Sequence, residues 1–130
     1  MITNTVYKIL DTNATVKAAT GGRIYPLHNA RQAISTPYVI IHQISVVPTH
    51  VKGEASPQDE VRIQVNSYHE EINDLNTIMT AIRAALDQYS GTVDGVVISH
   101  AYFDDESIDY DEDTRLYKGM QDFILKHNRS

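Results

Sequence analysis

The hydrophobic period changes once within the stretch from Glu60 to Tyr89. Between Val61 and Ser67, apolar or small residues alternate with polar ones, which is typical of a half-buried strand. From Ile72 to Leu86, apolar residues recur every three or four positions, which is typical of an amphipathic helix. A strand that leads almost directly into a helix indicates a compact α+β unit, in which the helix packs back on the sheet.

The rest of the chain predicts one more helical region and three more strands. Thr3 or Asn4 can cap a first helix, which is expected to bend near residues 11–13 and to end at Gly21-Gly22. Strands are expected over residues 38–46, 60–68, 96–103 and 115–126, and the long helix over 70–88. The order α-β-β-α-β-β favours a single α+β domain over residues 1–130, with an antiparallel four-stranded sheet and helices packed on one face.

Composition excludes several classes of protein. The chain has no cysteine, so it can form neither disulfides nor thiolate metal sites, which suits a reducing cytoplasm. Its apolar runs are far shorter than the ~20 residues of a membrane helix, so a soluble chain is expected. The formal net charge of -6 argues against tight wrapping of nucleic-acid phosphates, but it permits a surface past which DNA slides.

The usual catalytic and phosphate-binding motifs are absent from the sequence. No serine stands in a G-x-S-x-G elbow, and Gly21-Gly22 has neither spacing of a phosphate-binding loop. His42 and His100 fall in the middle of predicted strands and could meet across the sheet as a catalytic or metal-binding pair. Two polar-tipped sheet residues are the simpler interpretation, and no cofactor or metal is expected.

An acidic segment separates the last two predicted strands. Its carboxylates are Asp104, Asp105, Glu106, Asp109, Asp111, Glu112 and Asp113. Asp109, Asp111 and Asp113 have the spacing that begins an EF-hand calcium loop, but Thr114 and Met120 replace the required glycine and glutamate. The segment is therefore interpreted as a solvated hairpin tip, which can serve as a docking surface or an electrostatic rim.

Arg62 interrupts an otherwise neutral strand pattern. Ordinary solvation of a surface arginine is one interpretation. The alternative is an ion pair with a carboxylate across a subunit boundary, where arginine is enriched.

Four short motifs occur in one order along the chain. They are Gly22-Arg23-Ile24-Tyr25-Pro26-Leu27, Thr36-Pro37-Tyr38-Val39-Ile40, Val61-Arg62-Ile63-Gln64-Val65 with Tyr68, and Tyr117-Lys118-Gly119-Met120-Gln121-Asp122-Phe123. In this order and spacing the chain resembles, over nearly its whole length, the tail completion (tail terminator) proteins of long-tailed bacteriophages and related prophages.

The resemblance implies a structural virion protein and no enzyme. Such proteins assemble as a ring, typically of six subunits, at the head-proximal end of the tail tube. The ring ends tube polymerisation and offers a surface to the head-completion (neck) proteins, and DNA passes through its lumen. The implied partners are thus other copies of the chain, the tail tube protein and a neck protein, in a virion made in the bacterial cytoplasm, without membrane contact.

Two rival functions stay open at this point. One is another phage neck or tail subunit, such as a head–tail stopper or a tube protein. The other is a small ligand-binding or hydrolytic domain that uses His42 and His100.

A ring subunit needs an edge strand or an arm for its neighbour. The long connection over residues 46–59 is the candidate arm. The candidate interface residues are Val46, Val47, Pro48, His50, Val51, Lys52, Glu54 and Arg62. The acidic segment is the candidate docking or lumen loop.

Overall fold

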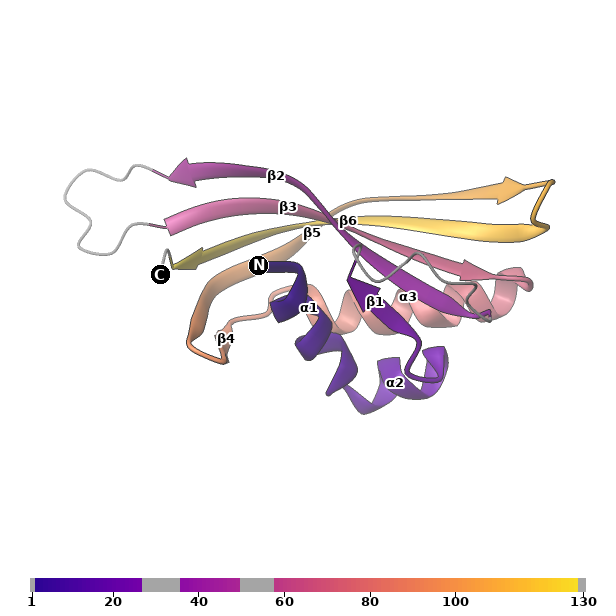
Figure 1. Cartoon of the computed structure of the whole chain (residues 1–130), viewed down its shortest axis with the longest axis horizontal. Helices are drawn as coiled ribbons and strands as arrows, with labels where there is room; N and C mark the ends of the chain where they lie inside the picture. Colours follow the sequence, from indigo (N-terminus) through magenta and orange to yellow (C-terminus); the bar gives the residue numbers. More distant parts are fainter. Residues whose placement is uncertain (1, 27–35, 50–57, 129–130) are drawn as a thin grey trace.

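The computed structural model describes residues 2–26, 36–49 and 58–128. In these ranges the chain forms three helices and six strands (Figure 1). They are α1 (Ile2–Asp11), α2 (Ala14–Thr20), β1 (Ile24–Pro26), β2 (Tyr38–Thr49), β3 (Gln58–His69), α3 (Ile72–Leu86), β4 (Gly91–Val93), β5 (Val96–Asp111) and β6 (Leu116–Asn128). None of the described helices is long and apolar enough to cross a membrane.

The described strands form one curled sheet in the order β1-β2-β3-β6-β5-β4. β1 runs parallel to β2, and every other neighbouring pair is antiparallel. The predicted antiparallel four-stranded sheet with the order α-β-β-α-β-β is therefore wrong, because the sheet is six-stranded and mixed. The two strands that the prediction missed have only three residues each, which is too short to display a period of two.

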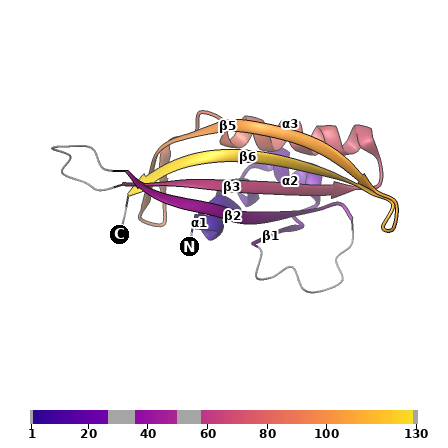
Figure 2. The same ribbon diagram turned by 90° about the horizontal axis from the view of Figure 1, so that it is seen from above.

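All three helices lie on one face of the sheet, and no helix or strand of the described residues covers the opposite face, which we call the uncovered face (Figures 1 and 2). The register explains this arrangement, because alternate residues of the two central strands turn their apolar side chains toward the helices. Val61, Ile63 and Val65 of β3 and Phe123 and Leu125 of β6 are almost fully buried. Each such side chain contributes roughly 1.5–3 kcal/mol relative to exposure.

The helical region divides where the sequence predicts a bend. The Asn13 side chain accepts a hydrogen bond of 3.1 Å from the Val16 N–H and so caps α2. Gly21 ends α2 in the left-handed conformation, at φ 67°, as expected for a glycine at a helix C-terminus. The predicted bend and the predicted end of this region are confirmed.

The Met79 side chain of α3 packs directly on Gly119 of β6. A Cβ atom at this position would lie 2.3 Å from the Met79 sulfur, so only glycine fits without movement. The buried Gln121 side chain donates a hydrogen bond of 2.9 Å from Nε2 to the Met79 carbonyl. Together these contacts fix the height and position of the helix over the sheet.

Candidate assembly surface

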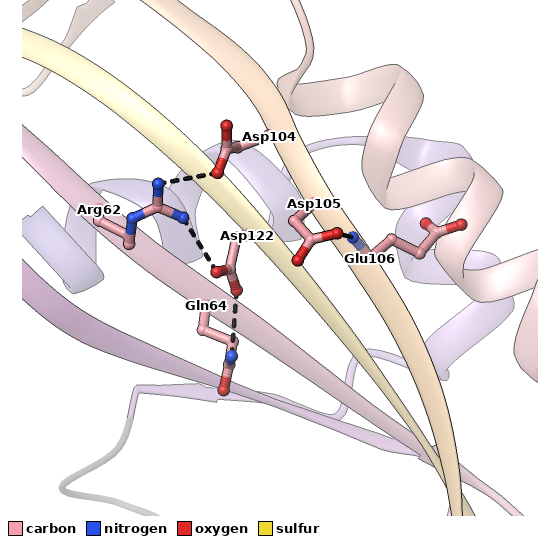
Figure 3. Close-up of polar contacts among 6 residues, drawn as sticks. All are labelled: Arg62, Gln64, Asp104, Asp105, Glu106 and Asp122. Atoms are coloured by element: carbon pink, nitrogen blue, oxygen red, sulfur yellow. Dashed lines mark hydrogen bonds and ion pairs between the residues drawn. The ribbon is translucent and has the colours of Figure 1, made fainter.

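An ionic network crosses three strands on the uncovered face of the sheet (Figure 3). Arg62 on β3 lies 2.8 Å from an oxygen of Asp104 on β5 and 3.0 Å from an oxygen of Asp122 on β6. The other oxygen of Asp122 accepts a hydrogen bond of 3.0 Å from the Gln64 side chain. The hydrogen bond to Asp104 is the main reason that the pKa of Arg62 is raised, so the guanidinium stays charged.

A β-bulge places Asp104 in this network. The register between β5 and β6 shifts between Phe103 and Asp105, so Asp104 is an extra residue whose side chain can reach across to β3. Arg62 therefore has two carboxylate partners inside its own chain. It does not need a neighbouring subunit to compensate its charge, and its role at a subunit boundary stays a prediction.

The two histidines considered as a pair do not meet. His42 lies on β2 and His100 on β5, and β3 and β6 run between those strands. Among the residues that the structure describes, no three His, Cys, Asp or Glu side chains gather as metal ligands would. Burial and the nearby Lys118 lower the pKa of His42.

Two cavities of about 500 Å³ lie on the helical side of the sheet. One is lined by residues of α1, α3 and β4, and the other by residues of α1 and β1. Neither is lined by His42 or His100. Neither of these two cavities therefore brings the histidines together as a hydrolytic or ligand-binding site would.

The acidic segment is not a loop. β5 continues to Asp111, so Asp104, Asp105, Glu106, Asp109 and Asp111 all lie on the strand, and only Glu112 and Asp113 lie in the turn. The segment is a strand because Ser107 to Tyr110 alternate in polarity and pair with β6. In the turn, the Asp111 carboxylate accepts a hydrogen bond of 2.9 Å from the Asp113 N–H, as in a tight turn.

Two eight-residue stretches of the sheet have no described strand on their outer side. β1 pairs with β2 only through residues 39–41, which leaves residues 42–49 of β2 open. β4 pairs with β5 only through residues 96–98. Next along β5, the Ala101 N–H donates to the Tyr89 carbonyl, and the Phe103 N–H donates to the Asp87 carboxylate. Residues 104–111 of β5 are left open. We call these stretches the β2 free edge (42–49) and the β5 free edge (104–111).

The free edges also carry most of the exposed large apolar side chains among the described residues. Ile44, Val46 and Val47 on the β2 free edge are 52%, 44% and 54% exposed. Ile108 and Tyr110 on the β5 free edge are 43% and 44% exposed, and the only other such residue in the described chain is Val97. Apolar side chains gathered on unpaired strand edges are typical of a surface that another chain covers.

The predicted arm is described only in part. Val46, Val47 and Pro48 lie on the β2 free edge, whereas His50, Val51, Lys52 and Glu54 lie outside the described residues. Ile108 and Tyr110 were not singled out from the sequence. Their alternation with Ser107 and Asp109 is the signal that could have found them.

Residues 4–127 of this sequence match the model of a protein family described as Tail completion protein gp17. The chain belongs to the Tail completion protein gp17 family. The resemblance deduced from the four motifs is thereby confirmed, and this family member is a structural protein of a phage tail and a component of the virion.

A solved structure of a gene transfer agent has a chain with a similar fold. It belongs to the "Virion of native gene transfer agent (GTA) particle" and gives a TM-score of 0.74 at 17% sequence identity. The match covers 95% of the tail completion chain and 92% of the other chain. Comparison with curated proteins gave no match.

Proposed function

We propose that this tail completion protein assembles as a ring of six copies that caps the head-proximal end of the tail tube. The ring ends tube polymerisation and offers its exposed side to the head-completion (neck) proteins. The observation that carries the proposal is the family match, which extends over residues 4–127. The proposed function assigns neither a catalytic residue nor a cofactor to the chain.

The two free edges support a ring in particular. They lie on opposite edges of the sheet and near opposite ends of the molecule (Figure 2). A subunit with two different contact surfaces joins its neighbours head to tail, and such contacts close into a ring when the rotation between copies allows it.

The distribution of charge supports passage of DNA through the lumen. The net charge is -6, and the guanidinium of Arg62 on the uncovered face is already paired with two carboxylates. A chain with a net negative charge holds DNA phosphates weakly, so DNA would slide past it.

Electron microscopy of particles made without this protein tests the proposal. We expect overlong tails without heads, because a tube that lacks its cap continues to polymerise. Complementation with the intact chain should restore normal length and head joining. Headless tails of normal length would instead indicate a head–tail stopper, and a complete lack of tails would indicate a tube protein. Either result would overturn the proposed capping function.

A further inference from the structure

We propose that neighbouring copies in the ring join by antiparallel pairing of the β2 free edge of one copy with the β5 free edge of the next. The sheets of successive copies would then form one continuous sheet around the ring. The inference rests on the proposed function, because it names the two surfaces through which the ring closes.

The lengths and directions of the two edges are complementary. Each free edge has eight residues. β2 and β5 run in opposite directions within the sheet, since each of the steps from β2 to β3, β6 and β5 is antiparallel. A second copy can be placed beside the first in the same orientation and moved along the strand direction. Its β2 free edge then runs antiparallel to the β5 free edge of the first copy. Its helices stay on the same face as those of the first copy.

The apolar side chains of the two edges then meet on one face. Val46 lies opposite the buried Val61, on the face that the helices cover. Ile108 lies opposite Gly119, which faces Met79 of α3, so Ile108 is on the same face. Tyr110 is two residues further along β5 and shares that face. Pairing would cover the three exposed side chains together, which makes the contact specific as well as hydrogen-bonded.

Charge argues against a second β5 free edge as the partner of the first. The β5 free edge carries five carboxylates, at Asp104, Asp105, Glu106, Asp109 and Asp111. Two β5 edges would therefore oppose like charges, which destabilises cross-strand pairs. The β2 free edge has no carboxylate, and His42 is its only ionisable residue. A β5 edge thus meets no negative charge on β2.

Aspartate side chains occupy part of the β5 free edge in the single subunit. Asp105 accepts a hydrogen bond of 2.8 Å from the Glu106 N–H, and Asp109 accepts one of 2.9 Å from the Tyr110 N–H. These carboxylates satisfy backbone groups that an incoming strand would otherwise use. They have to release those N–H groups when a neighbour pairs, so the edge is protected against indiscriminate association before assembly.

Disulfide cross-linking in assembled particles tests the pairing. The chain has no cysteine, so each introduced thiol is unique. Val46→Cys would be combined with Glu106→Cys, Ile108→Cys or Tyr110→Cys, which covers three registers on the helix-covered face. Opposed residues of paired strands have Cβ atoms about 4.5–5.5 Å apart, close enough for a disulfide after small adjustments. After mild oxidation, at least one combination should give a ladder of multiples of 14.6 kDa on a non-reducing gel.

Matched variants make the result decisive. Val46→Cys alone should give no cross-link, and Val97→Cys with Ile108→Cys should give none, because Val97 is exposed but lies outside both free edges.

Dimers from Val46→Cys alone would show that two β2 edges pair and would overturn the inference. A lack of any ladder from variants that are present in normal capped particles would also overturn it, while leaving the capping role intact. Absence of the unmodified chain from particles would contradict the proposed function itself.

Discussion

Arg62 shows how a single side chain can tie several strands together. It joins β3 to β5 and to β6 through Asp104 and Asp122, and its own side chain is only 32% exposed. Partial burial makes these contacts stronger than ordinary surface ion pairs, whose contribution is about 0–1 kcal/mol. The bulge at Asp104 is stable in part because its carboxylate has this partner.

Replacement of Arg62 by leucine should lower the free energy of unfolding by about 1–2 kcal/mol, because Asp104 and Asp122 lose their shared cation. Arg62→Lys should cost less, since it keeps the charge but cannot bridge both carboxylates as the planar group does. Urea unfolding measures both changes. The control is Lys8→Met, which removes the exposed ion pair with Asp94 and should cost less than about 0.5 kcal/mol. Equal losses from Arg62→Leu and from the control would contradict the role given to the network.

His42 should make stability depend on pH. Its pKa in the folded chain is lowered from the ordinary value of 6.5 by burial and by Lys118, so the unfolded chain binds the proton more readily. Stability should therefore fall as the pH drops from about 7.5 to about 5.5, and be regained as it rises. The urea midpoint should shift less between these pH values in His42→Gln than in the unchanged chain. His100→Gln, on β5, serves as the comparison, and an equal effect of the two substitutions would refute the assignment to His42.

At the scale of elements, helix α3 is held over β6 by the absence of a side chain at Gly119. The Met79 sulfur occupies the space that a Cβ atom would take. This arrangement depends on two elements that are about forty residues apart in the chain, so it could not be deduced from the period of either element.

Gly119→Ala should lower the free energy of unfolding by about 1–3 kcal/mol, because the added methyl group forces Met79 or the helix to move. In a chain that already carries Met79→Ala, the same substitution should cost almost nothing, since the clash is gone. Urea unfolding of the two single variants and the double variant gives the coupling energy. Additive losses would mean that the alanine at position 119 acts through another cause.

The sequence predicted long elements well and short ones poorly. The long helix and the strand that precedes it show a clear period, because many residues of each face the core. β1 pairs with residues 39–41 of β2, and β4 pairs with residues 96–98 of β5. Each of these two strands has only three residues, which is too short to show a period. The end of β5 was mistaken for a loop because acidic residues are rare in buried strands, but a free edge lets their side chains reach water.

At the scale of the whole molecule, the family could be deduced from the sequence, whereas most of the candidate surface could not. Each of the four motifs is a short local stretch, so the motifs and their order can be read directly from the sequence. The β5 free edge exists because no described strand pairs with residues 104–111 on their outer side, and this can be known only from the complete strand order. Ile108 and Val46 lie on opposite edges of the same sheet, so they can meet only when a second copy pairs with the first.

The position of β6 also has a consequence for how the subunit is made. β6 is the last of the described strands, yet it lies in the middle of the sheet between β3 and β5. Its bonds to β3 join residues as far apart as Arg62 and Asp122, so the sheet cannot close before β6 has been synthesised. A chain cut short by premature termination therefore lacks the centre of the sheet and cannot present both free edges. Only chains that contain β6 can therefore form the complete sheet.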